Sequence, residues 1–527
     1  MLESRTPLRL IPCWKRLSLE PDAKAAHHGR VETVTHGSRQ SPPAAFRPLA
    51  EQALSRAAGA PLSLGNRVDL LIDARANFDA WLEAIASAQH SILFGNYIFK
   101  NDAIGRGFVS ALAERARAGV RVFVLRDWLG CLGQSRVSFW QPLRDAGGEV
   151  RTFNPFDPLS PFGWINRDHR KLLTVDGRIG FVSGVCVSAT WLGDPARGRD
   201  PWRDTGVALH GPAIADIERA FAETWAALGV PLDTSAPASD AADAPAGNVA
   251  LRVIATQPSS AGTYRMDQLI AALARERLWL TDAYFIGVAP YLNALTNAAH
   301  DGVDVRLLVP GASDSPLVGA LSRTGYRALL EAGIRVYEWN GPMLHAKTAL
   351  ADDRWSRVGS TNLNIASWLG NCEIDVAIED AAFTGLLADQ YQHDLEHATE
   401  IVLSRKRARP VNPTSHHGLH GQGSARRSVV GAMRMATTLD AALRNRRVLS
   451  DTETRPLLGG ALLLLVIATV AALWPFALAW PLGALAAWIG ISLVVRWARL
   501  HRHRRESRRH ACDTDNAPRP TPPDDGH

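Results

Sequence analysis

From Val68 onward the chain alternates between two hydrophobic spacings. Short runs of apolar and β-branched residues predict strands at 68–72, 91–99 and 120–125. Between these runs, apolar residues at helical spacing predict helices at 78–88 and 107–118. Strands that alternate with helices are typical of an α/β fold, in which helices cover a mixed sheet.

The order of elements then recurs later in the chain. A helix is predicted at 266–273 and a strand at 278–286, and the segment 301–305 corresponds to 118–122. This repetition predicts two homologous lobes, each a mixed β-sheet flanked by helices, at 67–230 and 250–403. A linker rich in Ala, Pro, Ser and Asp, at 231–249, joins them.

The segments outside these lobes have different compositions. Residues 1–66 are rich in Arg, Ala, Pro, Ser and His and lack a long apolar stretch, which predicts a mobile N-terminal extension and no secretory signal. Residues 404–455 form a basic linker, where apolar residues at helical spacing in 426–449 indicate either an interfacial amphipathic helix or a segment docked on the lobes. Residues 456–495 carry no charge and predict two transmembrane helices that turn at 474–481. The tail, 496–527, is basic at first and then rich in Pro and Asp, which predicts disorder.

Charge and cysteine usage narrow the possible functions. The formal net charge is +6 and the excess lies mostly in the last quarter of the 527 residues, which favours anionic lipid or a topology signal over a nucleic-acid groove. Arginine flanks the apolar hairpin on both sides and is absent from its turn, so both flanks are expected in the cytoplasm. The five cysteines are scattered without metal-ligand spacing, which predicts reduced thiols, no disulfide and no metal site.

A duplicated motif provides the candidate chemistry. The pattern His-x-Lys-x4-Asp occurs twice, at His169, Lys171 and Asp176 and at His345, Lys347 and Asp352. Only six lysines occur among 58 Lys and Arg residues, so a site that keeps Lys indicates a need for a compact ammonium. We expect each motif on a strand that ends in a tight turn, with imidazole and ammonium on one face. This pair suits a phosphodiester, because Lys can hold the oxygens while His attacks phosphorus or protonates the leaving oxygen. Two surface histidines on amphipathic strands are the alternative, which the repetition disfavours.

The motifs and their flanks resemble the phospholipase D superfamily, and in particular its bacterial cardiolipin synthase branch. The flanks that carry the resemblance are His-Arg-Lys-Leu-Leu at 169–173, Trp-Arg-Asp-Thr at 202–205, Gly-Ser-Thr-Asn at 359–362 and Asn-Cys-Glu at 371–373. The resemblance covers about residues 68–403 and implies that the six motif residues are catalytic positions. Within each motif the Asp is expected to shape the turn and support the site.

The resemblance also implies supporting residues. It gives each imidazole a carboxylate that fixes the tautomer, and we expect Asp204 to serve His169 and Glu373 to serve His345. Ser360 and Asn362 are expected to support the phosphate, whereas the first lobe has Cys186 at the position of the amide; a buried thiol is favoured there over a reactive one. Aromatic residues near the first motif line an acyl entry or simply pack the core, and these alternatives stay open for Phe139, Trp140, Phe162, Trp164, Trp191 and Trp202.

The implied activity is that of a phosphatidyltransferase without metal or nucleotide cofactor. One His would attack phosphatidylglycerol, with family precedent favouring His169, and the phosphatidyl-histidine would pass its lipid to a second phosphatidylglycerol to give cardiolipin and glycerol. The alternatives are a hydrolytic phospholipase D, a nuclease of the same superfamily and a non-catalytic membrane scaffold. The expected partners are phosphatidylglycerol, other membrane phospholipids and the bilayer of a bacterial inner membrane, with no nucleic acid. Donor and acceptor preference and oligomeric state stay open.

Overall fold

The computed structural model describes residues 46–158, 166–233, 244–403, 446–449, 455–474, 476, 479–495 and 497–498. By its contacts the chain separates into two units, Met1–Pro48 and Leu49–His527. The sheet and the candidate site described below both belong to the second unit.

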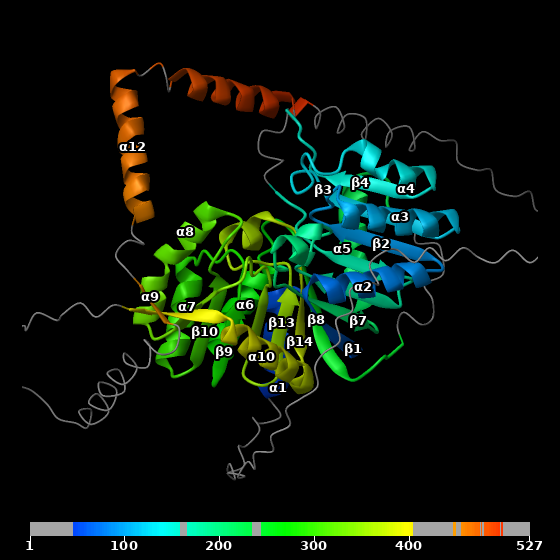
Figure 1. Ribbon diagram of the computed structural model, residues 1–527, viewed down its shortest axis with the longest axis horizontal. Coiled ribbons are helices and arrows are strands. Elements are labelled where there is room, and N and C mark those ends of the chain that lie inside the picture. The colour runs from blue at the N-terminus through cyan, green and yellow to red at the C-terminus, as the bar shows by residue number, and fades with distance from the viewer. Residues whose placement is uncertain are drawn as a thin grey trace, which may run out of the picture. The chain divides into compact units, whose positions relative to one another are not determined.

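A single mixed sheet of 16 strands organises this unit (Figure 1). The first half-sheet consists of β1 (Ser63–Ile72), β2 (Ser91–Asn96), β3 (Arg121–Asp127), β4 (Glu149–Phe153), β5 (Leu172–Val175), β6 (Ile179–Ser183) and β7 (Thr205–His210). The second half-sheet consists of β8 (Val249–Thr256), β9 (Arg277–Thr281), β10 (Asp304–Pro310), β11 (Arg335–Trp339), β12 (Thr348–Ala351), β13 (Trp355–Gly359), β14 (Glu373–Glu379) and β15 (Ala398–Leu403), with β16 (Arg446–Leu449) at its edge.

The two half-sheets have the same internal pairing. The strand order is β1-β7-β6-β5-β2-β3-β4 in the first and β8-β14-β13-β12-β9-β10-β11 in the second. Parallel pairing occurs within β2-β3-β4 and within β9-β10-β11, and the strands between carry antiparallel pairs. An antiparallel pairing of β1 with β8 joins the halves. The predicted α/β fold with a mixed sheet is therefore confirmed, whereas the division into two domains stays a prediction.

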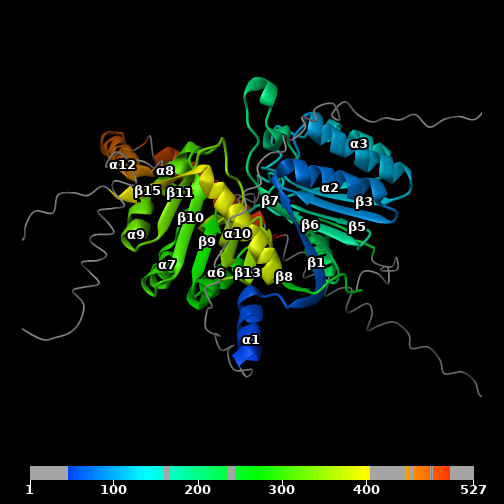
Figure 2. The same cartoon turned by 60° about the horizontal axis from the view of Figure 1, so that its bottom comes forward.

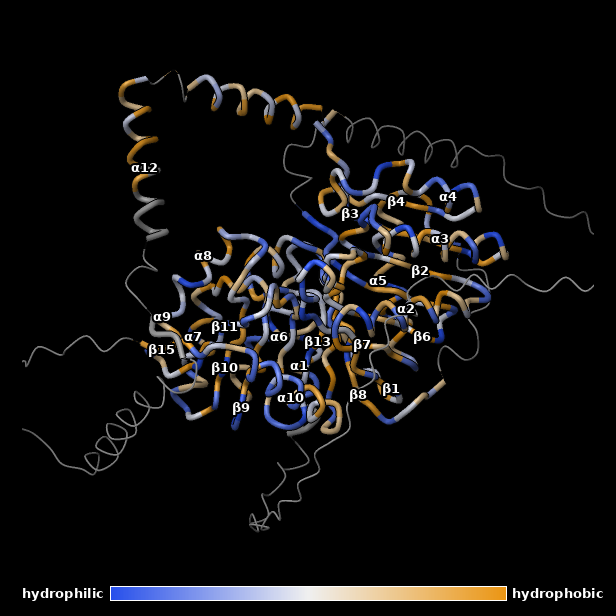
Figure 3. The backbone as a smooth tube through the Cα atoms, in the orientation of Figure 1, coloured by the Kyte–Doolittle hydropathy of each residue, from blue (hydrophilic) through white to orange (hydrophobic). Residues whose placement is uncertain are grey.

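Helices cover both faces of this sheet. They are α1 (Phe46–Ala58), α2 (Asp73–Ser87), α3 (Ala103–Arg117), α4 (Gln141–Asp145), α5 (Ile214–Ala227), α6 (Gly262–Leu273), α7 (Ala289–His300), α8 (Pro316–Thr324), α9 (Tyr326–Glu331) and α10 (Ala381–Glu396). A further helix, α12 (Arg455–Leu473), follows later in the chain. Successive side chains of a strand point to opposite faces. Accordingly Phe94 belongs to the core that includes residues of α2 and α3, while its neighbour Leu93 belongs to the core that includes residues of α5 and α10. Helices α2 and α3 lie along the strands of the first half-sheet (Figure 2). Hydrophobic residues recur along the strands, with hydrophilic residues between them (Figure 3).

The expected N-terminal boundary at residue 66 is wrong. Helix α1 and the first residues of β1 lie inside the segment that was expected to be a mobile extension. The reason is burial: Leu54 and Ala58 of α1 belong to the same hydrophobic core as Met266 and Ile270 of α6. Residues 1–45 lie outside the described part of the chain.

The C-terminal segment differs from its prediction as well. Residues 446–449 form a strand parallel to β15, and the rest of the expected amphipathic helix, with the linker from 404, lies outside the described residues. Residues 455–473 and 479–495 are helical. Among the helices that the structure describes, none is both long and apolar enough to cross a membrane. The two transmembrane helices predicted for 456–495 are thus not confirmed, and nearly all of the tail lies outside the described residues.

Candidate active site

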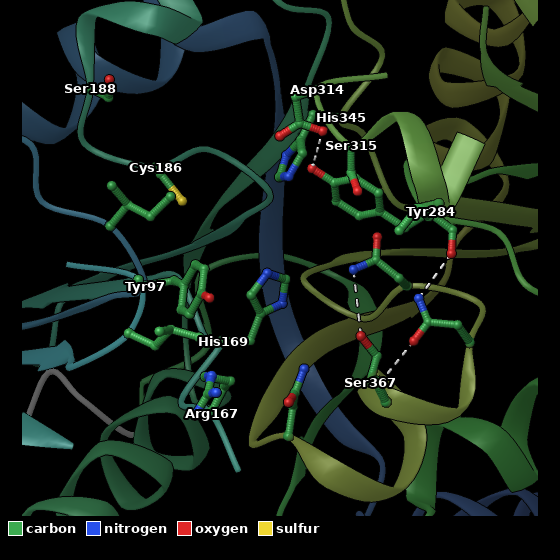
Figure 4. Close-up of a pocket in the computed structure, with 18 of the residues that line it drawn as sticks. Tyr97, Arg167, His169, Cys186, Ser188, Tyr284, Asp314, Ser315, His345 and Ser367 are labelled. Carbon is green, nitrogen blue, oxygen red and sulfur yellow. Dashed lines mark hydrogen bonds between the residues drawn. The ribbon is translucent and has the colours of Figure 1, made fainter. Parts of the chain in front are cut away.

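Both motif histidines lie in one pocket of about 750 Å³ (Figure 4). Each His-x-Lys segment is extended and precedes its strand, β5 or β12, so the expectation that His and Lys lie on the strand itself is wrong by a few residues. Each segment pairs with the other half of the chain: the His169 N–H donates to the carbonyl of Cys372 at 2.9 Å, and the His345 N–H donates to the carbonyl of Arg203 at 2.7 Å. These bonds bring the two halves together at the site.

The carboxylates are exchanged between the halves relative to the prediction. His169 Nδ1 lies 2.9 Å from Glu373, and His345 Nδ1 lies 2.8 Å from Asp204, so the expected assignments of Asp204 to His169 and Glu373 to His345 are wrong. The cause is backbone pairing, because Asp168 bridges to Cys372, the neighbour of Glu373, and Arg203, the neighbour of Asp204, bridges to Leu344. Each imidazole is therefore oriented by an acid from the opposite half.

The electrostatics keep both imidazoles neutral and both acids ionised. Burial, together with the Lys347 ammonium, lowers the pKa of His345 to about 3, and burial likewise lowers the pKa of His169. Burial alone would raise the pKa of Asp204, but the His345 imidazole beside it holds that pKa at about 2. In the same way His169 lowers the pKa of Glu373, against the effect of burial. An ionised carboxylate only accepts hydrogen bonds, so each Nδ1–H donates to its acid and leaves an Nε2 lone pair available.

The two lysines are deeply buried beside the histidines. The Lys171 ammonium donates to the carbonyl of His169 at 2.6 Å, and that of Lys347 donates to the carbonyl of His345. Burial lowers the pKa of Lys171 and lowers that of Lys347 to about 8. Water solvates these buried ammonium groups poorly, so an anion nearby stabilises them strongly. The anionic phosphodiester of a lipid is suited to this role.

The motif aspartates hold turns and do not reach the pocket. Asp176 has φ 54° and its carboxylate accepts the backbone N–H groups of residues 89, 90 and 91. Asp352 has φ 52° and accepts those of residues 275, 276 and 277. The structure therefore supports the expected turn-shaping role and places neither carboxylate where it could touch substrate.

The supporting residues behave differently in the two halves. Ser360 donates to Glu373 at 2.6 Å and so holds the acid that holds His169. Asn362 lines the pocket and its Oδ1 is buried without a hydrogen-bond partner among the described residues. Cys186 lines the pocket too, where burial raises its pKa to about 11, which keeps it a neutral thiol as expected. The phosphate environment is thus asymmetric.

Aromatic rings hold the imidazoles in place. Tyr97 meets His169 edge to face, with ring centroids 4.8 Å apart (Figure 4). Trp191, Trp202 and Tyr284 surround His345 at 5.2, 5.9 and 5.8 Å. Trp191 also donates its indole N–H to Asp204 at 2.8 Å.

The aromatic residues that were expected near the first motif therefore lie in different places. Trp191 and Trp202 belong to the second histidine, Phe139 and Trp140 are buried in the core, and Phe162 and Trp164 lie outside the described residues. The two tyrosines, Tyr97 after β2 and Tyr284 after β9, were missed as site residues. Their proximity to the motifs could have been inferred, because β5 pairs with β2 and β12 pairs with β9.

The pocket holds no group of metal ligands within the described part of the chain. A cluster of three possible ligands occurs there at His393, Glu396 and His397, which are exposed at the end of α10 and do not line the pocket.

Comparison with known proteins finds cardiolipin synthases that are similar to this chain over about two thirds of its length. Residues 268–396 match the family described as cardiolipin synthase, PLD-like domain. Cardiolipin synthase A of Pseudomonas putida is 35% identical over 351 residues, which cover 65% of this chain and 71% of that protein. Cardiolipin synthase of Alkalihalophilus pseudofirmus is 30% identical, over 66% of this chain and 70% of that protein.

The fold has a structural match as well. The crystal structure of phosphatidylserine synthase from Haemophilus influenzae aligns with a TM-score of 0.52 at 17% identity, covering 67% of this chain and 91% of that one. At this identity the likeness supports the fold alone. Taken with the sequence relatives and the duplicated motif, the chain belongs to the cardiolipin synthase family of the phospholipase D superfamily.

Proposed function

We propose that this protein is a cardiolipin synthase, which transfers a phosphatidyl group from one phosphatidylglycerol to another and releases glycerol. One observation carries the proposal: two neutral imidazoles, each oriented by a carboxylate, line a single pocket, and a buried lysine lies beside each of them. A displacement at phosphorus needs a nucleophile on one side and a proton donor for the leaving oxygen on the other. The names of the curated relatives, cardiolipin synthase A and cardiolipin synthase, support the cardiolipin product.

The first half-reaction forms the covalent intermediate. Nε2 of His169 attacks phosphorus, the P–N bond forms and the P–O bond to glycerol breaks. His345 must carry a proton on Nε2 to hand to the departing oxygen, and the bound diester anion favours that protonated form. Lys171 and Lys347 stabilise the negative charge that develops on the phosphoryl oxygens.

The second half-reaction reverses these roles. His345, now neutral, removes the proton from a hydroxyl of the acceptor phosphatidylglycerol, whose oxygen attacks phosphorus. The P–N bond breaks, cardiolipin is released and His169 returns to its starting form. Asp204 and Glu373 keep each imidazole in the tautomer that these steps require.

A hydrolytic phospholipase D uses the same groups with water as acceptor, so the products distinguish the two. We expect purified protein and radiolabelled phosphatidylglycerol in mixed micelles to give cardiolipin and glycerol in equal amounts. Phosphatidic acid as the main product would instead establish the hydrolytic reaction. No release of glycerol at all would contradict both and leave the scaffold alternative.

The pH dependence should show the perturbed lysine. The pKa of Lys347 lies near 8, below its usual value of 10.5, so its charge is lost as the pH rises through about 8. We expect kcat/KM, which reports the free enzyme, to fall over that interval. In Lys347→Arg the falling limb should move to higher pH, because a guanidinium stays charged. A pH profile that is identical in the two proteins would exclude Lys347 as the titrating group.

Chelation should have little effect on the rate, because the two lysines take the role that a divalent ion would have. We expect turnover after dialysis against EDTA to stay within about twofold of the untreated rate, where loss of a Lewis acid would cost several kcal/mol. Complete loss of activity, with recovery on adding one metal ion, would contradict this mechanism.

The location follows from the substrate and from the sequence. A bacterial inner membrane supplies the lipid, and the arginines around 456–495 favour the catalytic part in the cytoplasm. Single cysteines at Ala477 and Ser507 in a cysteine-free variant can be treated with an impermeant maleimide in intact spheroplasts. We expect labelling at position 477 alone. Labelling at 507 alone would reverse the orientation, and labelling at both would replace the hairpin with another path.

A further inference from the structure

Cardiolipin synthesis places two phosphodiesters in one pocket, and the histidine pair accounts for one of them. In the proposed mechanism the reacting phosphate of the donor lies between the imidazoles, where Lys171 and Lys347 stabilise its charge. The acceptor phosphatidylglycerol carries a phosphate of its own, which does not react and still has a negative charge. A pocket that prefers this acceptor to water or to a neutral alcohol needs a second cationic group.

Lys100 has the position and the chemistry for that role. It lines the same pocket as His169 and His345, and it is only half-buried, so its ammonium can meet a ligand. The one hydrogen bond of the Lys100 ammonium within the described residues is a long contact of 3.5 Å to the Thr190 hydroxyl, and no carboxylate pairs with the ammonium there. Thr190 precedes Trp191, whose ring contacts His345, so Lys100 belongs to the wall beside the second histidine.

Lysine usage across the chain points to the same conclusion. Of the six lysines, three fall within the described residues, and these three are Lys100, Lys171 and Lys347. All three belong to this site, two beside the histidines and one on the pocket wall. The remainder of the described surface uses arginine as its cation. Arg167 is another cation that lines the pocket, and it lies beside His169, whereas Lys100 contacts Thr190 next to the Trp191 ring that meets His345 (Figure 4).

The repeat supplies an internal comparison. The backbone N–H of Lys100 donates to the carbonyl of Val187 at 3.0 Å, just past Cys186, and that of Ile286 donates to Leu363 at 3.2 Å, just past Asn362. Lys100 and Ile286 therefore occupy equivalent positions in the two halves, and both line the pocket. One wall is cationic where the other is apolar. This difference suits two lipids that occupy the site in different roles.

We propose that Lys100, with the hydroxyl of Thr190, binds the non-reacting phosphodiester of the acceptor phosphatidylglycerol. The inference rests on the proposed function. Ser188 lines the same pocket (Figure 4), and its hydroxyl lies 3.0 Å from that of Thr190. The nearby Asp102 carboxylate accepts two backbone N–H groups and the Ser188 hydroxyl, which compensates its charge. Asp314 also lines the pocket, from the other half, and accepts the Tyr284 hydroxyl at 2.8 Å.

Acceptor competition tests this directly. Full-length wild-type protein and Lys100→Gln are given labelled phosphatidylglycerol in mixed micelles with excess glycerol, and cardiolipin formation is compared with glycerol exchange. Glycerol has the attacking hydroxyl but lacks the phosphate. We expect Lys100→Gln to lower the ratio of cardiolipin formation to glycerol exchange by about tenfold or more, the effect of losing a charge-assisted hydrogen bond. Lys100→Arg, which keeps the charge, should recover most of the ratio.

Ile286→Gln is the matched control, because it places the same side chain at the equivalent position of the other wall. We expect its product ratio to stay within about twofold of wild type, since no charged contact is lost. An unchanged ratio in Lys100→Gln, or an equal fall in Ile286→Gln, would overturn the acceptor subsite. Wild-type protein that forms neither product would instead contradict the proposed function, so the two failures are distinguishable.

Discussion

His169→Ala and His345→Ala should each lower the rate of cardiolipin formation by at least about 100-fold, because the two imidazoles divide the nucleophile and proton-transfer roles. Both lie in one pocket, and each is fixed by a carboxylate from the opposite half, so the remaining histidine is held in the wrong place to perform both roles. Initial rates on labelled phosphatidylglycerol measure the effect. We expect His169→Ala to be the more severe change, since it removes the atom that bonds to phosphorus.

Both variants should remain folded, and thermal unfolding followed by circular dichroism checks this. Removing a His leaves a buried carboxylate without its partner, so some loss of stability is expected. A single variant that folds and keeps more than about one per cent of the wild-type rate would contradict the shared site, because general acid-base catalysis alone contributes 100-fold or more.

Substitution of either carboxylate that orients a histidine from the opposite half should also cause a large loss of activity. Asp204→Asn and Glu373→Gln keep the shape of each side chain but let the amide donate to Nδ1, which favours the wrong tautomer of its imidazole. We expect each substitution to lower kcat by roughly 100-fold to 10,000-fold with a much smaller change in KM.

The pairing itself is tested by nuclear magnetic resonance of protein labelled with ¹⁵N-histidine. In Asp204→Asn we expect the Nδ1 signal of His345 to move and that of His169 to stay. Glu373→Gln should give the converse result, with the His→Ala variants supplying the assignments. Movement of the His169 signal alone in Asp204→Asn would restore the pairing within each half and contradict the structure.

The sequence predicts the fold well where periodicity and repetition carry the information. Each half repeats one order of strands and helices, and the structure gives both half-sheets the same pairing. The extension at 1–66 was misjudged because α1 is short and its buried residues, Leu54 and Ala58, show only one helical interval. Helix α1 is ordered because it packs against residues of α6, some 200 residues away in the chain, and local composition cannot show such a contact.

The site was predictable in its residues but not in its pairing. The motif spacing identifies both histidines and lysines, and chain order suggests that each acid serves the His of its own half. Which backbone segments meet is decided by the bridges from Asp168 to Cys372 and from Arg203 to Leu344, contacts that span well over a hundred residues. Lys100 had no motif to mark it, and only its place on the pocket wall shows that it belongs to the site.

Trapping the covalent intermediate tests the central claim most directly. Wild-type protein mixed with phosphatidylglycerol is quenched in alkali, where a phosphoryl-histidine bond survives, and is digested and analysed by mass spectrometry. We predict a phosphatidyl adduct on His169 that forms and decays at rates consistent with turnover and is absent from His169→Ala. Cardiolipin formation with no adduct on either His169 or His345 would contradict the mechanism.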